Sequence, residues 1–342
     1  MKAAVFHGPR DVRIETVAEP EDPGKGEVVL EVLRAAICGT DAAEWDHGPV
    51  LCRPGVVLGH EFVGRVAAVG AGTADLRVGD RVVSGAGISC GRCAWCLAGR
   101  TNLCVEYRTL GLQVDGGLAE YVTSPASICR VVPEQVDDDA AAMTQPLAVA
   151  LHALSRVALQ RAESVAVVGV GGIGSFIVAG AAHRAPDGRV VAIDLDAQRL
   201  ATAAALGAHE TVDASGGDLA QLLLELTGGV GFDVVIEATG APHAPAAAFA
   251  GARRGGRVLL VGLHGASREL ELTPMILREI DVFTTVAHVC DSDIPAALEL
   301  LAESAVAKVT AGPRIPLDEL VAEGLQPLAE RRATGKILVT PR

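Results

Sequence analysis

The spacing of hydrophobic residues along the chain changes near residue 147. Before that point, short apolar runs of β type recur between Gly, Pro and Asp turn signals. These runs predict strands at 28–37, 62–69, 80–85, 118–124 and 128–133. Many short strands at close spacing are typical of an antiparallel barrel or sandwich. The first part of the chain is therefore predicted to be a compact β-rich domain.

From about residue 148 to 287, apolar runs that predict strands alternate with segments of helical period. Predicted strands cover 164–170, 189–194, 210–214, 232–240 and 257–263, and predicted helices cover 173–184, 196–206, 218–226 and 243–252. Repeated strand–helix units of this length are typical of a parallel, doubly wound sheet. The last segment, 288–342, is predicted to contain a helix at 293–303 and to end in a strand at 336–341.

Composition narrows the class of protein. The chain has 342 residues, which is enough for two domains of ordinary size. Hydrophobic residues make up 50% of the chain but aromatic residues only 3%, so the core must be built from Ala, Val, Leu and Ile. The net charge of −13 would be repelled by nucleic acid and by anionic membranes, which disfavours both as partners.

Three features together predict a soluble, cytoplasmic protein. Residues 164–182 carry no charge, but their glycines divide them into a strand, a turn and a helix rather than a membrane span. The first residues lack an apolar core followed by a small-residue cleavage site, as a signal peptide would have. The cysteines outside the segment 88–105 are scattered, which suggests thiols in a reducing compartment; they are Cys38, Cys52, Cys129 and Cys290.

Four cysteines, Cys90, Cys93, Cys96 and Cys104, follow one another closely in the segment 88–105. Two C-x2-C steps and a C-x7-C step let one loop turn four sulfurs toward a common centre, as a tetrahedral zinc site requires. A disulfide knot would need strained pairings between neighbouring C-x-x-C steps, and an iron–sulfur cluster usually has a different spacing. A redox C-x-x-C pair is the remaining alternative. The segment is predicted to be a lobe with a closed, structural zinc site that does no chemistry.

A second motif, from Gly169 to Gly174, reads Gly-Val-Gly-Gly-Ile-Gly. It follows an apolar strand and opens a predicted helix, and the next strand ends in Asp194. In this context the first glycine makes a tight turn, Gly171 lets the backbone approach a pyrophosphate, and Gly174 allows close helix–strand packing. Asp194 can accept hydrogen bonds from the adenosine ribose hydroxyls. The motif predicts a dinucleotide-binding turn.

Two further segments carry candidate metal ligands: Ile37-Cys38-Gly39-Thr40-Asp41 and Gly59-His60-Glu61. Taken singly, Cys38 could be a buried apolar residue and His60 a core histidine. Together with the four-cysteine lobe and the dinucleotide turn, they resemble the zinc-dependent medium-chain alcohol dehydrogenases over essentially the whole chain. The surroundings are most similar to the butanediol, sorbitol and threonine dehydrogenase branch, as in HEFVGRVAAVG, VGDRV, DGGLAEYV, QPLAVALHAL and GKILVTP.

The resemblance implies an α/β fold of two domains. A GroES-like, β-rich catalytic domain would comprise residues 1–147 and be completed by 288–342, and a Rossmann domain that binds NAD would comprise 148–287. It also implies two zinc ions per subunit, one catalytic and one structural, and a homo-oligomer, either a dimer or a tetramer.

The resemblance assigns Cys38 and His60 as ligands of the catalytic zinc, with Glu61 or Gln145 completing the protein ligands. Thr40 would pass on the proton of the alcohol. The branch usually has a carboxylate where this chain has Gln145, and often a histidine where it has Ala43. His47, Glu44, Trp45 and Tyr107 are further candidates for the proton relay or the substrate pocket.

The resemblance assigns the cofactor to Gly169, Gly171, Gly172, Ile173, Gly174, Asp194, Arg199, Val261, Gly262, Leu263 and Lys336. Asp194 favours NAD over NADP, although Arg199 could accept a 2′-phosphate. Lys336 is expected to approach the pyrophosphate. The implied reaction is hydride transfer between NAD and a secondary alcohol such as a vicinal diol, polyol or sugar. Alternatives are an aldose or amino-alcohol dehydrogenase and an inactive, redox-sensing member of the family.

Overall fold

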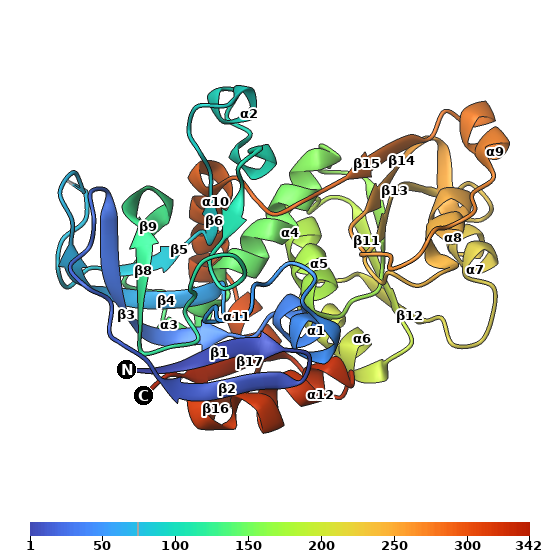
Figure 1. The fold of residues 1–342 in the computed structure, drawn as a ribbon. Helices are drawn as coiled ribbons and strands as arrows, with labels where there is room; N and C mark the ends of the chain where they lie inside the picture. The colour runs from blue at the N-terminus through green and yellow to red at the C-terminus, as the bar shows by residue number, and fades with distance from the viewer. Residues whose placement is uncertain (74) are drawn as a thin grey trace. The chain divides into compact units, whose positions relative to one another are not determined.

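The protein is described by a computed structural model that covers residues 1–73 and 75–342 (Figure 1). The chain forms two compact units. The first comprises residues 1–148 and 288–342 and so contains both chain ends, and the second comprises residues 149–287. Among the described residues, no helix is both long and apolar enough to cross a membrane.

The first unit is built around a seven-stranded sheet in the order β16-β17-β3-β4-β5-β9, with β8 also paired to β3. Its strands are β3 (Glu27–Ala36), β4 (Glu61–Val69), β5 (Arg81–Ser84), β8 (Tyr121–Pro125), β9 (Cys129–Val131), β16 (Ala311–Pro316) and β17 (Lys336–Thr340). The pairing of β3 with β4 is antiparallel, as is that of β3 with β17 near the end of the chain. The C-terminal strand therefore completes the sheet that holds β3 and β4.

Shorter elements complete the first unit. The strands are β1 (Lys2–Gly8), β2 (Asp11–Thr16), β6 (Gly87–Ile88) and β7 (Arg108–Thr109), and the α-helices are α1 (Gly39–His47), α2 (Ala94–Leu97), α3 (Asp138–Ala142), α10 (Cys290–Glu303), α11 (Val306–Thr310) and α12 (Gln326–Ala329). There are also 3-10 helices at Thr101–Leu103, Ala126–Ile128 and Leu317–Glu319 and a π-helix at Leu320–Leu325. Helix α4 (Thr144–Arg156) runs across the boundary between the two units.

The second unit contains a six-stranded sheet in the order β12-β11-β10-β13-β14-β15, in which every pair of neighbours is parallel. The strands are β10 (Ser164–Val168), β11 (Arg189–Asp194), β12 (Glu210–Asp213), β13 (Phe232–Glu237), β14 (Ala252–Leu260) and β15 (Asp281–Thr284), and the helices are α5 (Gly172–Arg184), α6 (Ala197–Ala205), α7 (Leu219–Glu225), α8 (Ala244–Gly251) and α9 (Leu272–Leu277). The predicted α/β fold class, with a β-rich domain and a doubly wound parallel sheet, is confirmed.

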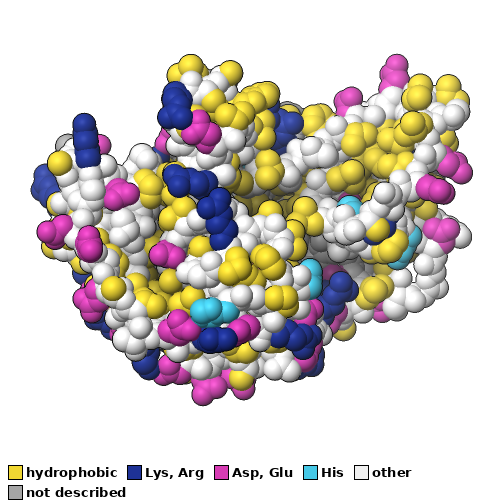
Figure 2. All heavy atoms as spheres, in the orientation of Figure 1, with side chains coloured by type: hydrophobic (Ala, Val, Ile, Leu, Met, Phe, Trp, Pro, Cys, Tyr) yellow, Lys and Arg dark blue, Asp and Glu magenta, His cyan; other side chains and the backbone are white. Residues whose placement is uncertain are grey.

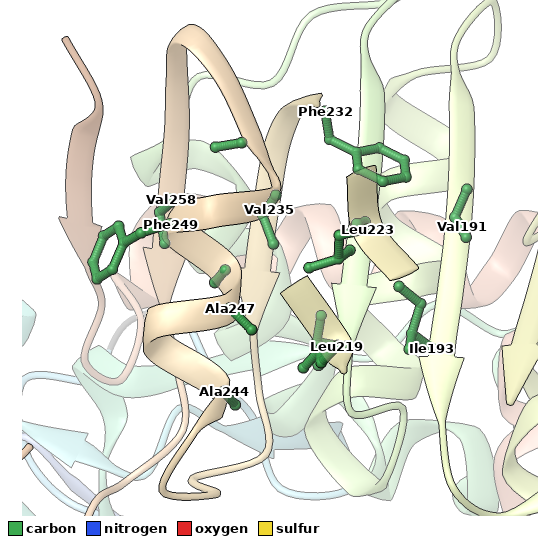
Figure 3. Packing of buried hydrophobic residues seen from close by; sticks show 14 residues of the cluster. Val191, Ile193, Leu219, Leu223, Phe232, Val235, Ala244, Ala247, Phe249 and Val258 are labelled. Atoms are coloured by element: carbon green, nitrogen blue, oxygen red, sulfur yellow. The ribbon is translucent and has the colours of Figure 1, made fainter. Parts of the chain in front are cut away.

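The core of the second unit consists mainly of small and branched aliphatic side chains (Figure 3). Leu219 and Leu223 of α7 and Ala247 of α8 pack against strand residues such as Val191 and Val235. Parallel strands covered by helices are buried on both faces, which explains why β10 is a continuous apolar run rather than an alternating one.

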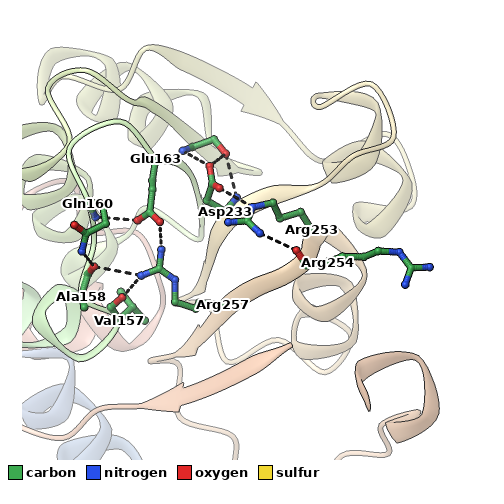
Figure 4. A network of polar contacts seen from close by, with 9 residues as sticks. Val157, Ala158, Gln160, Glu163, Asp233, Arg253, Arg254 and Arg257 are labelled. Atoms are coloured by element: carbon green, nitrogen blue, oxygen red, sulfur yellow. Dashed lines mark hydrogen bonds and ion pairs between the residues drawn. The ribbon is translucent and has the colours of Figure 1, made fainter. Parts of the chain in front are cut away.

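Polar side chains tie together the N-terminal ends of three strands in the same unit (Figure 4). Asp233 of β13 accepts hydrogen bonds from the backbone N–H (2.8 Å) and the hydroxyl (2.6 Å) of Ser164, where β10 begins, and from Arg253 Nε (2.7 Å). Burial raises the pKa of Asp233, but the hydrogen bonds from Ser164 and Arg253 lower it by more, so the net pKa is below its ordinary value. Arg257 of β14 pairs with Glu163.

The structure differs from the predicted elements mainly at loops after strands. The strand predicted at 257–263 is β14, which begins earlier, at Ala252, and ends at Leu260. It ends there because the N–H groups of Val261 and Gly262 both donate to the one carbonyl of Glu237 (2.8 and 3.1 Å). The predicted strand at 118–124 begins at Tyr121, since Leu118 instead bonds to Leu58. The hairpin of β1 and β2 and helix α1 were not predicted.

Candidate metal centres and nucleotide turn

The four cysteines of the lobe lie close enough to share one ion. The sulfurs of Cys90, Cys93, Cys96 and Cys104 all lie within 4.8 Å of one another, and none forms a disulfide. Cys93 Sγ and Cys96 Sγ are 3.5 Å apart. Zinc–sulfur bonds of about 2.3 Å in a tetrahedron place sulfurs roughly 3.8 Å apart, so the donor set and its spacing fit a structural zinc.

Backbone N–H groups point at these sulfurs. Cys104 Sγ accepts from the N–H of Cys90 (3.2 Å) and of Glu106 (3.3 Å). Hydrogen bonds from the backbone of Cys96 and Val105 lower the pKa of Cys93 to about 6, whereas desolvation raises the pKa of Cys96 to about 11. Part of the cluster is thus prepared as thiolate, and a bound cation would stabilise the anionic form of the rest.

A second cluster brings together Cys38, His60 and Glu61, whose ligand atoms lie within 4.8 Å of one another. Cys38 follows β3 and immediately precedes α1, while His60 and Glu61 stand at the start of β4. The antiparallel pairing of Ala36 with Glu61 places these two segments side by side. His60 and Glu61 are almost completely buried. A thiolate, an imidazole and a carboxylate converging in this way are a donor set suited to zinc.

Asp41 belongs to the same cluster, and sequence reasoning gave it no role. Its Oδ2 accepts the N–H of Cys38 (2.9 Å) and its Oδ1 lies 3.5 Å from His60 Nδ1. Asp41 is fully buried. A metal-binding histidine usually turns its second ring nitrogen to a carboxylate, so this contact leaves Nε2 of His60 for a metal. The available signal was an acidic residue three positions after the residue that caps α1.

The negative charges around His60 outweigh its burial. Burial lowers the pKa of His60, but Asp41 and Cys38 raise it, and the net pKa is well above its usual value. The same groups that would stabilise an imidazolium would also stabilise a metal cation at this position. The charge of the cluster is therefore suited to a bound cation.

Lys336, at the start of β17, lies beside this cluster. Its ammonium is 2.8 Å from Glu61 Oε1 and 2.5 Å from Oε2, and its side chain is 11% exposed. Burial lowers the pKa of Lys336, but the negative charges of Glu61 and Cys38 raise it, and the net pKa is above its usual value. The sequence suggested that Lys336 approaches the pyrophosphate, and that role stays a prediction. In the structure Lys336 pairs with Glu61, because β17 joins the sheet through β3.

The remaining candidates of the first unit occupy different settings. Thr40 Oγ1 lies 3.7 Å from Cys38 Sγ in the first turn of α1. Gln145 lies half-buried in the first turn of α4, and its role as a ligand stays a prediction. The buried carboxylate of Glu44 accepts the N–H groups of Val50 (2.8 Å) and Leu51 (2.7 Å), so it holds that loop rather than facing a substrate.

In the second unit, the glycine-rich motif forms the turn between β10 and α5. Gly169 has φ of +86°, and a Cβ there would lie 2.4 Å from Thr239 Cγ2. A Cβ on Gly174 would lie 1.9 Å from the carbonyl oxygen of Gly169. Next to Gly172 there is open space, and the nearest atom to a Cβ on Gly171 would be Arg199 Nη1 at 3.7 Å. The outer glycines are thus required by packing, while the inner ones leave room at a helix N-terminus, which suits a pyrophosphate.

Asp194 closes this turn from the neighbouring strand. Its Oδ2 accepts the N–H of Val170 (2.8 Å), and its Oδ1 accepts those of Leu195 (2.8 Å) and Asp196 (3.1 Å). Arg199 Nη1 lies 3.8 Å from Oδ1. A carboxylate offers about four lone-pair positions, so Asp194 keeps limited capacity for a ligand hydroxyl. Leu263, expected beside the nicotinamide together with Val261 and Gly262, is 90% exposed in the loop after β14.

Comparisons with known proteins give a family match in each of the two units. The family model of the alcohol dehydrogenase GroES-like domain matches residues 24–134, and that of the zinc-binding dehydrogenase matches residues 172–303. The chain is 33% identical to the sorbitol dehydrogenase of Bacillus subtilis strain 168 over 90% of this chain and 87% of that protein. It superposes on 2R,3R-butanediol dehydrogenase from Bacillus subtilis with a TM-score of 0.91 and 30% identity, covering 100% of this chain and 99% of that one.

Two other solved structures of this fold contain nicotinamide cofactors. An alcohol dehydrogenase from E. coli CFT073 is complexed with NADH (TM-score 0.91, 27% identity, 99% of each chain), and a zinc-binding dehydrogenase from Sinorhizobium meliloti 1021 is bound to NADP (0.90, 32%, 99% of each chain). The chain belongs to the zinc-dependent medium-chain alcohol dehydrogenase family. It is an oxidoreductase that uses zinc and a nicotinamide cofactor, as the sequence predicted.

Proposed function

We propose that the protein transfers a hydride between NAD and a secondary alcohol, with a vicinal diol, polyol or sugar as substrate. The observation that carries the proposal is the buried convergence of Cys38, His60 and Glu61, backed by Asp41. The similarity to a sorbitol and a butanediol dehydrogenase supports the substrate class. Retention of the complete cluster argues against the alternative of an inactive, redox-sensing protein.

Cys38 and His60 would hold the catalytic zinc, with Glu61 or Gln145 as the further protein ligand. Zinc bound there supplies a Lewis acid that lowers the pKa of a substrate hydroxyl. Thr40 would accept the proton of that hydroxyl and release its own proton outward, and its nearness to the cluster, with Oγ1 3.7 Å from Cys38 Sγ, supports this role. Asp41 orients His60, and Lys336 balances the charge of Glu61. Two zinc ions per subunit are expected, the second in the cysteine lobe.

NAD is proposed over NADP because of Asp194. A 2′-phosphate placed against this carboxylate would meet a negative charge, and even a screened repulsion of about 1.4 kcal/mol corresponds to a tenfold preference. Arg199 already faces Asp194 and so does not act as a free cation. We expect kcat/KM for NAD to exceed that for NADP by at least about tenfold. Equal values, or a preference for NADP, would show that Asp194 does not meet the adenosine ribose.

The substrate class is tested by a panel assay. The purified protein, with its zinc content measured, is offered 2,3-butanediol, sorbitol, other polyols, an aldose and L-threonine, each with NAD and with NADP. We expect NADH formation with at least one diol or polyol and weaker activity with the aldose and the amino alcohol. Turnover restricted to L-threonine or to an aldose would instead favour the corresponding alternative.

We further propose a homo-oligomer that uses the free edge of the second unit's sheet. Within the described part of the chain, strand β15 has only one neighbour in the sheet. The side chains exposed on α9 and β15 are Leu272, Ile276, Leu277 and Val282. Figure 2 shows hydrophobic side chains gathered over this part of the second unit. An unpaired strand edge can pair with another chain, and a contiguous exposed apolar patch marks an interaction site. Light scattering is expected to give a dimer or a tetramer, and Ile276→Lys is expected to lower the oligomeric state.

A further inference from the structure

A buried carboxylate organises the loops that follow β13 and β14 in the second unit. Glu237, the last residue of β13, is fully buried. Its Oε1 accepts hydrogen bonds from the N–H (2.7 Å) and the hydroxyl (2.5 Å) of Thr239 and from the N–H of Gly240 (2.9 Å). Its Oε2 lies 3.2 Å from Nε2 of His264. One side chain therefore holds the loop after β13 and reaches the loop after β14.

The loop that carries His264 is locked in the same place. The N–H groups of Val261 and Gly262 donate to the backbone carbonyl of Glu237 (2.8 and 3.1 Å). A Cβ on Gly262 would lie 2.3 Å from the nitrogen of Gly240 and 2.7 Å from Glu237 Oε2, so the two loops pack without space between them. The imidazole of His264 is held by this packing rather than free to rotate in solvent, since its side chain is only 17% exposed.

The second ring nitrogen of His264, Nδ1, is also buried. Across residues 1–73 and 75–342, no donor or acceptor forms a hydrogen bond with its buried Nδ1. A carboxylate can only accept, so Nε2 must carry the hydrogen that faces Glu237. In the neutral ring Nδ1 is then a hydrogen-bond acceptor. Buried polar atoms are nearly always satisfied, so this Nδ1 calls for a donor from outside the described residues, which a water or a ligand group can supply.

The position of His264 indicates which ligand group would supply that donor. Strand β10, which leads into the glycine-rich turn, has β11 on one side and β13 on the other. Asp194 ends β11, whereas Glu237 pairs with Val168 at the end of β10. The methyl group of Thr239 packs beside Gly169. In such sheets a dinucleotide lies across the carboxyl ends of the strands, with its pyrophosphate at the glycine-rich turn. If its adenosine ribose lies at Asp194, on the β11 side of β10, its nicotinamide half lies on the other side, near the ends of β13 and β14.

We propose that His264, held by Glu237, is a positioning residue for the nicotinamide half of the cofactor. Nδ1 accepts a hydrogen bond from that half, either from a ribose hydroxyl or from the carboxamide N–H. Glu237 does not touch the cofactor and acts by fixing which ring nitrogen of His264 carries the hydrogen. The inference rests on the proposed use of NAD and adds a residue that orients its reactive end.

The first test replaces the imidazole without releasing Glu237. In His264→Gln the amide N–H can still donate to Glu237 Oε2, but the acceptor at the position of Nδ1 is lost. Equilibrium binding to the purified protein is measured by NADH fluorescence, with ADP and ADP-ribose as competitors, and folding is followed by thermal unfolding. The matched control is His183→Gln, because His183 is exposed in the last turn of α5, at the other end of that helix from the glycine-rich turn.

We expect His264→Gln to raise the Kd for NADH about tenfold, as for the loss of one buried hydrogen bond, with Kd for ADP and Tm unchanged. A parallel loss for ADP-ribose would identify the ribose hydroxyl as the donor, and no loss for ADP-ribose would identify the carboxamide. Unchanged NADH binding, or an equal loss for NADH and ADP, would overturn the assignment of His264. A wild-type protein that binds neither NADH nor NADPH would instead overturn the proposed function itself.

The second test reverses the polarity of Nδ1. In Glu237→Gln the amide oxygen must accept the hydrogen bonds of Thr239 and Gly240, so the amide N–H₂ faces Nε2 of His264. Nε2 must then accept a hydrogen bond, and the ring hydrogen moves to Nδ1. We expect a similar loss of NADH affinity from Glu237→Gln, and little additional loss when it is combined with His264→Gln. Fully additive losses would show that Glu237 does not act through His264. Thermal unfolding of each variant separates these outcomes from simple damage to the fold.

Discussion

At the residue scale, the metal cluster is a set of charges that depend on one another. Cys38, Asp41 and Glu61 bring negative charge into a buried place, and His60 and Lys336 face it. Burial alone would push the pKa values of His60 and Lys336 down, yet both are raised because the anionic neighbours dominate. A cation in the cluster would therefore compete with Lys336 for Glu61.

Replacement of Lys336 by methionine tests this competition. The change leaves Glu61 as a buried charge without its partner, which typically costs about 3 kcal/mol of stability. Because zinc would take over part of that charge, the loss should be clearly smaller with two zinc ions bound per subunit than with the lobe zinc alone. Urea unfolding of both forms measures the difference, with Lys308→Met, at an exposed position of α11, as the control. The same loss in both forms would mean that Glu61 does not approach the metal.

At the scale of elements, packing and ligand binding make separate demands on the same turn. The glycine-rich turn joins β10 to α5, and its outer glycines are confined by backbone contacts that its inner glycines lack. At the other end of these strands, hydrogen bonds among Asp233, Ser164 and Arg253 connect the beginnings of β10, β13 and β14. Each site predicts a different response to a small substitution.

Alanine at Gly174 and at Gly172 should separate packing from binding. A Cβ on Gly174 would lie 1.9 Å from the carbonyl oxygen of Gly169, so Gly174→Ala should destabilise the fold by about 2 kcal/mol. A Cβ on Gly172 meets open space, so Gly172→Ala should leave the free energy of unfolding nearly unchanged. Because Gly172 is the first residue of α5, the added methyl group should crowd a pyrophosphate at the helix N-terminus and weaken NADH binding. Thermal unfolding and NADH titration of the two variants check this. Unchanged NADH affinity in Gly172→Ala would place the pyrophosphate elsewhere.

Asp233 should make the stability of the protein depend on pH. Its pKa is lowered in the folded state, so its contribution is present above its unfolded pKa of about 3.9 and is lost as the pH falls through the lower folded value. Asp233→Asn should cost about 1 to 2 kcal/mol at pH 6, and the difference from wild type should shrink below about pH 4. Urea unfolding over this range measures the difference. Asp187→Asn, in an exposed ion pair, is the control and should show little effect.

At the scale of the whole molecule, the two metal clusters and the nucleotide turn belong to different compact units. Both clusters lie in the unit formed by the two chain ends, and the turn lies in the middle unit. Loss of a metal site should therefore affect the first unit without abolishing recognition of the nucleotide by the second.

Cys96→Ser tests this separation. Removing one of four thiolates should release the lobe zinc, and because metal binding is coupled to folding of such a loop, Tm should fall. Metal analysis should give one zinc per subunit instead of two, while ADP, which needs only the adenine side of the turn, should still bind. A variant with unchanged zinc content and unchanged Tm would reject the structural zinc site.

Much of the fold and part of the site follow from short stretches of sequence. The change from short β runs to strand–helix units predicted the two architectures, because the periods of strands and helices are set by local backbone geometry. The cysteine spacing and the glycine-rich turn predicted compact sites for the same reason, since all their residues come from one loop. These features required no knowledge of long-range pairing.

Contacts between distant segments could be decided only by the tertiary structure. Lys336 meets Glu61 across 275 residues because β17 joins β3 in the sheet, and His264 meets Glu237 because parallel strands end at one edge. Asp41 reaches His60 through the pairing of β3 with β4. The sequence by itself therefore determined the elements and the donor sets within single loops, whereas the partners that fix charge and orientation depended on strand order and register, which no local pattern encodes.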